Sequence, residues 1–246
     1  MESSTNDITY KDIKILYEDN HLLVVVKPQN VPTQSDESGD IDLLTLLKQY
    51  IKETYNKKGD AYVGMVQRLD RPTGGVMVFA KTSKAAARLS ASLVDGEFEK
   101  RYLAVVYDTP KEKQQMLINY LKKDSNTNNV YIVPELTEGA KRAELSYKVL
   151  NSLGKASLLS VKLTTGRSHQ IRVQLANMKN PIVGDCRYSG NRPKANCNLA
   201  LWAAEIRFKH PVNDNIMVFR VYPPEDEKPW NYFNLENYFA LTIKNN

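Results

Sequence analysis

Two segments in the middle of the chain constrain its fold more than any other feature, because each has the pattern of two strands joined by a turn. Residues 116–133 and residues 143–166 both contain two runs rich in apolar and β-branched side chains around a short polar turn. A hairpin places its two strands antiparallel. Further strands are predicted within residues 13–28, 74–81, 99–108, 200–211 and 215–224. We therefore expect most of the sheet to be antiparallel.

Four segments instead have the apolar spacing of helices: residues 40–55, 82–93, 168–178 and 229–240. In the first, Asp40 or Asp42 is available as the N-terminal cap. In the second, Ala86, Leu89 and Leu93 share one face. The helices interrupt the strands without a βαβ rhythm, and no internal repeat is present. The sequence therefore predicts an α+β fold with a mixed, largely antiparallel central sheet flanked by helices, in a single domain of 246 residues.

Composition indicates a folded protein of a reducing compartment. Hydrophobic residues make up 42% of the chain, enough to bury a core. No apolar run approaches the ~20 residues of a membrane helix, and the polar start, residues 1–12, does not resemble a secretory or transit peptide. Cys186 and Cys197 are the only cysteines, too few for a disulfide framework. We expect a cytoplasmic protein that does not bind a membrane, and a monomer is the simplest assembly.

The net charge of +6 is concentrated in residues 162–194. Seven basic residues lie there, opposed only by Asp185: Lys162, Arg167, Arg172, Lys179, Arg187, Arg192 and Lys194. This basic segment alone carries +6, and the rest of the chain is neutral overall. It is either a solvated basic face or a surface for a polyanion, most often nucleic acid.

Signatures of the common cofactors and catalytic classes are missing from the sequence. It contains no G-x-G-x-x-G after a strand, no phosphate-binding glycine–lysine loop and no G-x-S-x-G. Cys186, Cys197, His169 and His210 lack the close cysteine pair that zinc sites usually have. A histidine taken alone is more often a hydrogen-bonded structural residue than a base. We therefore expect neither a cofactor nor a metal.

The first candidate for chemistry is Asp70, within residues 67–75 (QRLDRPTGG). It lies between Arg68 and Arg71, and Pro72 follows directly. Neighbouring cations keep a carboxyl group ionised, and an ionised aspartate can act as a nucleophile. The alternative is a structural ion pair at a turn, which is the more common origin of such a pattern.

Two further candidates lie downstream. In residues 164–176 (TTGRSHQIRVQLA) a strand ends at a glycine and a helix follows, so that Arg167 stands at a helix N-terminus, where a phosphate or a carboxylate can bind. Tyr102 lies in a strand behind two basic residues, where it could stack on a base. The alternatives are an arginine-capped surface helix and a core tyrosine with its hydroxyl at the surface.

In their order along the chain, these pieces resemble the RluA family of RNA pseudouridine synthases. The central motif of that family is usually His-Arg-Leu-Asp, two variable residues, Thr-Ser-Gly and an apolar strand ending in Ala-Lys; here the stretch reads QRLDRPTGGVMVFAK. Further matches are YEDNHLLVVVKP, KRYLAVV, GRSHQIRVQLA, PIVGDCRY and LALWAAEIRFKHP. The resemblance covers about residues 14–222, and several motifs in one order are far more specific than any one of them.

The resemblance implies an isomerase that converts specific uridines of structured RNA, ribosomal or transfer RNA, to pseudouridine without a metal or a cofactor. By this likeness Asp70 is the catalytic aspartate, and Tyr102 is the tyrosine that packs on the flipped base. Arg167 matches the arginine that pairs with the aspartate. The residues of the matched motifs that we assign to substrate binding are Arg68, Arg71, Lys81, His169 and Arg172.

Three positions depart from the family pattern. Gln67 replaces the usual histidine, Gly74 the usual serine, and Gln174 the histidine common after Arg-Val. None of them falls on the matched aspartate, tyrosine or arginine, so we expect the chain to be active. Many relatives carry an N-terminal S4 RNA-binding domain; only residues 1–13 precede the match here, so none is expected.

The sequence leaves two alternatives to the isomerase. The first is a non-catalytic RNA-binding protein on the same fold, which would have no need of an intact aspartate, tyrosine and arginine. The second is a metal- or nucleotide-dependent hydrolase of nucleic acid, which would need a carboxylate or histidine cluster that the sequence does not show. The sequence does not identify the RNA or the uridine.

Overall fold

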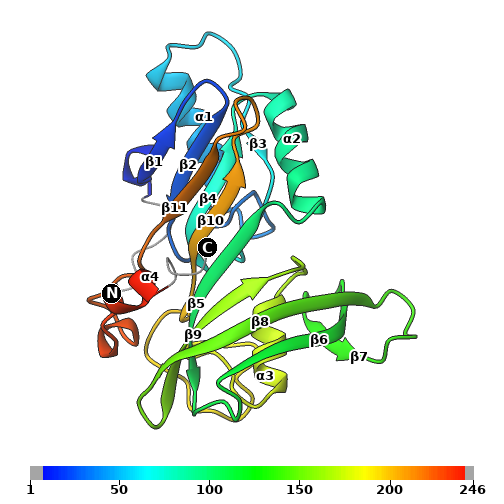
Figure 1. Cartoon of the computed structure of the whole chain (residues 1–246). Helices are drawn as coiled ribbons and strands as arrows, with labels where there is room; N and C mark the ends of the chain where they lie inside the picture. Colours follow the sequence, from blue (N-terminus) through cyan, green and yellow to red (C-terminus); the bar gives the residue numbers. More distant parts are fainter. Residues whose placement is uncertain (1–7, 242–246) are drawn as a thin grey trace. The chain divides into compact units, whose positions relative to one another are not determined.

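The chain divides into two compact units, each built from two stretches of sequence (Figure 1). The computed structural model describes residues 8–241, so residues 1–7 of the polar start lie outside the described residues. Unit 1 consists of residues 1–99 and 203–221, and unit 2 of residues 100–202 and 222–246. That the whole chain forms a single domain stays a prediction.

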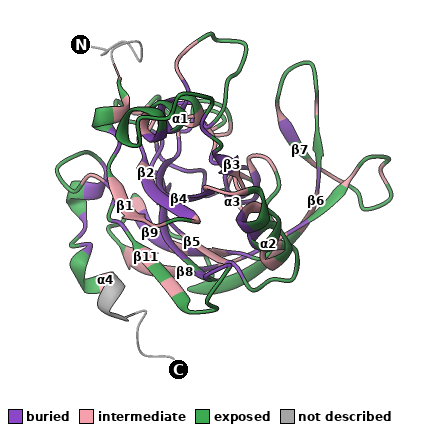
Figure 2. Cartoon of the chain, turned by 90° about the horizontal axis from the view of Figure 1, so that it is seen from above, coloured by how far each residue is buried: buried purple, intermediate pink, exposed green. Residues whose placement is uncertain are grey.

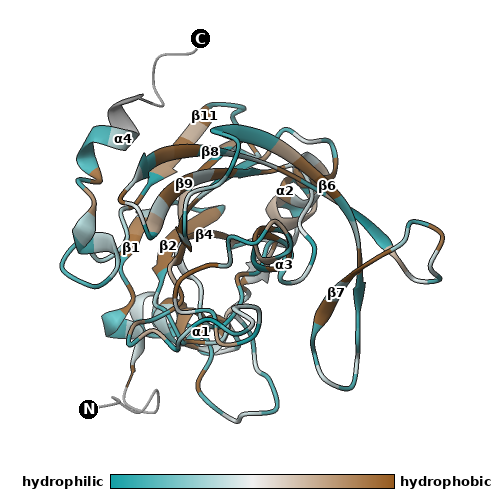
Figure 3. Cartoon of the chain, turned by 90° about the horizontal axis from the view of Figure 1, so that it is seen from below, coloured by the Kyte–Doolittle hydropathy of each residue, from teal (hydrophilic) through white to brown (hydrophobic). Residues whose placement is uncertain are grey.

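Unit 1 contains a sheet with the strand order β1-β2-β4-β10-β11, in which the short β3 also pairs with β4. Its strands are β1 (Ile15–Glu18), β2 (Leu22–Lys27), β3 (Gly64–Met65), β4 (Gly74–Ala80), β10 (Leu201–Lys209) and β11 (Ile216–Arg220). The pairs β1–β2, β2–β4, β3–β4 and β10–β11 are antiparallel. Nearly all residues of β2 and β4 are buried and apolar, as the colours of these strands in Figures 2 and 3 show, so these two strands form the core of the unit.

The helices of unit 1 begin where the sequence predicts. α1 (Leu43–Thr54) is capped by Asp42, whose carboxylate accepts the Thr45 N–H, and α2 (Ser83–Val94) is capped in the same way by Thr82. A short 3₁₀ turn, η2 (Tyr10–Asp12), contacts α1.

The predicted apolar face of α2, with Ala86, Leu89 and Leu93, is buried in part. Leu89 is buried together with Ala85, whereas Ala86 and Leu93 are only half-buried. The helix contacts β3 and β4, and Ala86 takes part in the contact with β3, since a Cβ on Gly64 would lie 3.0 Å from the Ala86 Cβ.

Gly75 determines how closely β4 approaches β10. Its φ of +125° lies in a region that residues with a side chain rarely adopt, and a Cβ at this position would lie 2.2 Å from the carbonyl oxygen of Ala203. Only glycine therefore fits where β4 begins, directly after the Asp70 turn.

Unit 2 contains a sheet with the strand order β5-β9-β8-β6-β7, in which every neighbouring pair is antiparallel. Its strands are β5 (Glu99–Tyr107), β6 (Gln114–Lys123), β7 (Val130–Val133), β8 (Lys141–Ser152) and β9 (Ala156–Leu163). Both predicted hairpins are confirmed, as β6–β7 and β8–β9. The helix α3 (Gln170–Asn177) covers β6 to β8 through a core of Leu121, Val130, Ala143 and Val173.

The predicted helix at residues 229–240 is interrupted. A 3₁₀ turn, η3 (Trp230–Tyr232), is followed by the extended residue Phe233 (φ −121°, ψ 138°), and α4 (Glu236–Leu241) starts only after it. Phe233 and Trp230 are both buried, so burying these two aromatic side chains outweighs the helical pattern of the segment.

The predicted fold class is confirmed. Both units combine antiparallel strands with a few helices, which is an α+β arrangement. Within residues 8–241, none of the helices has the length and apolar character needed to cross a membrane.

Candidate functional site

Asp70 lies on a tight turn that leads into β4. The Thr73 N–H donates a hydrogen bond of 2.9 Å to the Asp70 carbonyl and closes the turn. Side chains of residues 27–33 bind the backbone of this turn: Thr33 Oγ1 donates to the Leu69 carbonyl at 2.8 Å, and Gln29 Nε2 donates to the Pro72 carbonyl at 2.9 Å. The half-buried Asp70 is thus presented by a backbone that is fixed on both sides.

Lys27, at the end of β2, is a residue of this site that the sequence did not reveal. Its side chain is fully buried, and Nζ donates to the carbonyls of Pro28 at 2.9 Å, Arg71 at 2.9 Å and Thr73 at 2.8 Å. Burial lowers the pKa of Lys27 from 10.5 to about 7, while the charge of Asp70 raises it and that of Arg71 lowers it further. In the sequence Lys27 follows five apolar strand residues and lies inside the matched motif YEDNHLLVVVKP, but neither feature marks it as part of the site.

Arg71 is held by the loop that precedes α1. Its Nε donates to the Asn30 carbonyl at 3.1 Å and Nη1 to Ser38 Oγ at 2.9 Å, and Nη2 forms an ion pair with Asp40. Arg68, on the other side of Asp70, is exposed. The two arginines of the motif therefore have different surroundings, and Arg71 anchors the Asp70 turn to the loop.

Lys81 lies at the other end of β4 from Asp70, so the structure does not bring these two candidates together. Its Nζ lies 2.6 Å from Glu18 Oε1 and 4.7 Å from the centre of the Tyr55 ring. Burial would raise the pKa of Glu18, but hydrogen bonds from Lys81, Tyr50 and Tyr55 outweigh it and lower that pKa. Lys81 thus has a part-buried acidic partner in unit 1.

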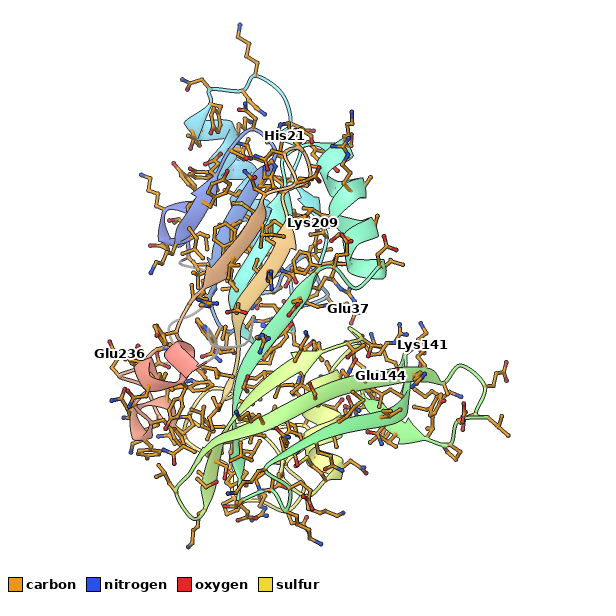
Figure 4. All side chains as sticks on the ribbon, viewed as in Figure 1. His21, Glu37, Lys141, Glu144, Lys209 and Glu236 are labelled. Carbon is orange, nitrogen blue, oxygen red and sulfur yellow. The ribbon has the colours of Figure 1, made fainter. Side chains whose placement is uncertain are left out.

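In unit 2, the loop that carries Arg167 is fixed to β8. Gln170 Nε2 donates to the Glu144 carbonyl at 2.9 Å, and Gln170 Oε1 accepts the Arg167 N–H at 3.0 Å. The exposed Arg167 donates from Nε to the Arg142 carbonyl at 3.0 Å. Figure 4 labels Glu144 and its neighbour Lys141 on this strand. The buried Gln170, which no pattern in the sequence marks, therefore shapes the loop.

Tyr102 lies on β5, paired with Val161 of β9, and only 6% of its surface is exposed. Two residues earlier on the same strand, Lys100 Nζ is close to Gly166, since a Cβ on that glycine would lie 3.3 Å from it. Burial lowers the pKa of Lys100. The strand of Tyr102 and the loop of Arg167 thus meet at Lys100 within unit 2.

His169 and Arg172 are held by the turn at residues 185–188. His169, with a left-handed φ of 51°, places Nδ1 2.7 Å from the Tyr188 hydroxyl, and that hydroxyl accepts the Val130 N–H at 2.9 Å. Arg172 is 5% exposed and binds Asp185, which is 0% exposed. Arg172 is therefore better placed to hold this turn than to contact an RNA, and its assignment to substrate binding stays a prediction.

The Arg172–Asp185 pair also changes how the charge of the basic segment is distributed. These two charges cancel in the interior, and the other six basic residues of the segment, each half-buried or exposed, carry its +6. Arg192 is paired with Asp108, and Arg187 donates to Asn129 at 2.8 Å.

In the part of the chain that the structure describes, no three histidine, cysteine, aspartate or glutamate side chains gather as metal ligands would.

Several known proteins are similar to this chain in sequence. A family model described as RNA pseudouridylate synthase matches residues 21–177. The Bacillus subtilis (strain 168) protein named "Uncharacterized RNA pseudouridine synthase YhcT" is 32% identical over 231 residues, which are 92% of this chain and 74% of that protein. "Ribosomal large subunit pseudouridine synthase D" of Zymomonas mobilis subsp. mobilis is 32% identical over 227 residues, 87% of this chain and 70% of that protein.

The fold is shared with solved structures as well. "Human RNA Pseudouridylate Synthase Domain Containing 4" superposes with a TM-score of 0.72 at 22% identity, over 86% of this chain and 88% of that one. "Human RNA Pseudouridylate Synthase Domain Containing 1" superposes with a TM-score of 0.68 at 21% identity, over 88% of this chain and 86% of that one.

Proposed function

Because this chain belongs to the RluA family of RNA pseudouridine synthases, we propose that Asp70 is the carboxylate with which it converts uridine to pseudouridine in RNA. In that reaction the C1′–N1 bond breaks, uracil turns, and a C1′–C5 bond forms. N1 gains a proton, and the hydrogen at C5 is lost to water. A base must leave its stack before this chemistry can occur.

The observation that carries the proposal is the fixed turn at residues 69–73. A nucleophile or general base acts efficiently only when its geometry is set in advance, and this turn holds Asp70 by its own backbone and by the side chains of Gln29 and Thr33. Attack on C1′, attack on C6 and assistance to proton loss all require the same ionised carboxylate at the same place.

We carry Tyr102 and Arg167 forward as catalytic residues, and Arg68, Arg71, Lys81 and His169 as substrate-binding residues. The support for Arg167 is its exposed guanidinium on a loop fixed by Gln170. The support for Arg68 is its exposed position next to Asp70. Exposed cations are the groups that bind phosphates of RNA.

For the substrate we propose ribosomal RNA of the large subunit. The support is that relatives from Zymomonas mobilis and Buchnera aphidicola are named ribosomal large subunit pseudouridine synthases, D and C. Transfer RNA is the alternative outcome of the experiment below. We also propose a cytoplasmic location, because Cys186 and Cys197 are free thiols, which fit a reducing compartment. The proposed assembly is a monomer, which light scattering tests.

The deciding experiment is the release of tritium from RNA that carries it at uracil C5. Purified protein, with EDTA present, is incubated with labelled ribosomal RNA and, separately, with transfer RNA. We expect release from ribosomal RNA and none with the Asp70→Asn variant. Release by Asp70→Asn would refute the role of Asp70. Binding without release from either RNA would favour the non-catalytic alternative, and loss of release caused by EDTA would indicate a metal.

A further inference from the structure

One face of the sheet of unit 2 is covered by α3, and much of the other face is open. α3 packs Val173 against Leu121 of β6 and Ala143 of β8. Side chains alternate between the two faces along a strand, so Met116 and Ile118 of β6 lie on the side away from α3. These two residues are 59% and 47% exposed, and Figure 2 shows most of β6 in the colour of exposed residues. We call this side of the sheet the open face.

The strand register places basic residues from four strands on the open face. One row runs through Met116 of β6, Ser146 of β8, Lys162 of β9 and Arg101 of β5, each opposite the next. Residues an even number of positions along the same strands share this face. The basic residues on the open face are therefore Arg101, Lys122, Arg142, Lys148 and Lys162.

The open face is positively charged. The acidic residues that the five strands place on it are Glu99 and Glu144, and Glu144, labelled in Figure 4, is already paired with Arg142 at 3.0 Å. Lys122 and Lys148 are both exposed. A surface of this charge attracts a polyanion and repels a basic partner.

The open face also presents apolar and aromatic surface to solvent. Met116 and Ile118 are neighbours on this face, and Tyr131 of β7, opposite Lys122, is 51% exposed. Bases of unpaired RNA stack on aromatic side chains, and some RNA-binding domains present these side chains from a sheet. Exposed lysines next to such groups provide what an unpaired stretch of RNA needs, since they bind its phosphates.

The open face is separate from the catalytic candidates of unit 2. Tyr102 follows Arg101 on β5, so its side chain lies on the opposite face of the sheet, which is the α3 side. Arg167 stands in the loop that precedes α3. An RNA contact on the open face therefore involves nucleotides other than the target uridine.

We propose that the open face binds an unpaired stretch of the substrate RNA outside the target uridine. Bases stack on Tyr131, Met116 and Ile118, and the ammonium groups of Lys122 and Lys148 bind phosphates. This inference rests on the proposed function, from which it takes RNA as the partner. Its consequence is that the open face contributes to the affinity for RNA and not to the chemical step.

Photocrosslinking tests the location in the wild-type protein. The probe is an oligouridine of about ten nucleotides that carries 5-iodouridine, and the crosslinked residues are identified by mass spectrometry. We expect crosslinks to Tyr131 and to the peptide that contains Met116 and Ile118, and their loss when unlabelled oligouridine competes. Crosslinks confined to the α3 side, at Tyr102 or Tyr188, refute the proposal.

Substitution of exposed tyrosines measures the contribution of stacking. Tyr131→Ala should raise the Kd for the oligouridine roughly tenfold, because one base loses its stacking partner, whereas Tyr131→Phe should keep the Kd within about a factor of two. Tyr232→Ala is the control, since Tyr232 is 53% exposed but lies close in sequence to the acidic residues 225–227. Equal Kd values for wild type and Tyr131→Ala refute the proposal, as does an equal loss in Tyr232→Ala.

Substitution of lysines measures the contribution of phosphate contacts. In Lys122→Gln/Lys148→Gln the slope of log Kd against log salt concentration should fall by about 1.4, because each contact with single-stranded RNA contributes about 0.7. Lys48→Gln/Lys52→Gln, which removes two exposed lysines of α1, is the control of equal charge. The single-turnover rate of tritium release at saturating ribosomal RNA should be that of wild type in both. An unchanged slope, or an equal change in the control, refutes the proposal.

Light scattering and tritium release separate the remaining outcomes. If the wild type self-associates and Met116→Ser makes it monomeric without changing the Kd for RNA, the open face joins two copies of the chain and the proposal is refuted. If the wild type releases no tritium from any RNA, the proposed function fails, but the crosslinks still decide whether the open face binds RNA. Release of tritium without crosslinks on the open face leaves the proposed function standing and refutes this inference.

Discussion

Arg172 and Asp185 face each other in the interior of unit 2, joined by two hydrogen bonds of 2.8 Å, from Nε to Oδ2 and from Nη2 to Oδ1. Burial would raise the pKa of Asp185, but Arg172 and the N–H groups of Arg187 and Tyr188 outweigh it and lower that pKa below 3.8. The pair links α3 to the turn at residues 185–188, and loss of either partner leaves a buried charge without its counterpart.

We expect Asp185→Asn and Arg172→Met each to lower the free energy of unfolding by roughly 3 kcal/mol at pH 7, and the Arg172→Met/Asp185→Asn double variant to lose less than the sum. A carboxyl group whose pKa is lower in the folded than in the unfolded protein stabilises the folded state at pH values above its unfolded pKa. This stabilisation is lost as the pH falls through the pKa of the folded state. Urea unfolding of wild type and Asp185→Asn should therefore converge as the pH falls below about 4. A difference that is independent of pH would contradict the ion pair.

The exposed part of the basic segment should govern how RNA binding depends on salt. Lys179, Arg187 and Lys194 are exposed. Replacing all three by alanine should weaken binding and reduce the slope of log Kd against log salt concentration by about 2 to 3, roughly one for each phosphate contact that is lost. Lys209→Ala, outside the segment, is the matched control. An unchanged slope in the triple variant would exclude this segment as the RNA surface.

The stability that depends on Lys27 should increase with pH. In the folded state its pKa is about 7, and in the unfolded state 10.5. Between these values the unfolded chain binds more protons, so raising the pH favours the folded state; below pH 7 both states are protonated and the cost of burial is complete. The free energy of unfolding of wild type minus that of Lys27→Met should rise by roughly 2 kcal/mol from pH 7 to pH 9. A constant difference would contradict the lowered pKa.

Gly75→Ala should destabilise unit 1 far more than Gly39→Ala. Both glycines have a positive φ, +125° and +72°, but a Cβ on Gly39 meets nothing within 4 Å, whereas one on Gly75 would lie 2.2 Å from the Ala203 carbonyl oxygen. Gly39→Ala should cost about 1 kcal/mol from backbone strain alone, and Gly75→Ala at least ~3 kcal/mol because β4 and β10 must also separate. Thermal unfolding of the two variants measures the difference, and equal losses would contradict the close approach.

Much of the fold could be predicted because its signals are local. Both hairpins of unit 2 and the cap at Asp42 follow from residues that are neighbours in sequence. The break at Phe233 was missed because the burial of Trp230 and Phe233 depends on the tertiary fold.

The candidate site was predictable only where a motif marks it. Asp70 stands out through its arginine neighbours and through the family motif. Lys27 also lies in a matched motif, but its contact with the turn could not be predicted, because its acceptors on Arg71 and Thr73 are 44 and 46 residues away in sequence. The buried state of Arg172 was equally hidden, since its partner Asp185 lies 13 residues further on, in a segment without regular structure. Contacts of this kind are set by the tertiary fold, and no local pattern carries them.

The close approach of Gly75 and Ala203 has a consequence for how the chain folds while it is being synthesised. β4 pairs with β10, whose residues from Ala203 onward belong to unit 1 but follow the whole of residues 100–202. A growing chain that has just passed Glu99 therefore has most of one edge of β4 still open, since only β3 pairs there, with Phe79 and Ala80. The sheet that supports Asp70 can be completed only after translation has passed β11, so a fragment that ends at Glu99 should expose that edge and aggregate.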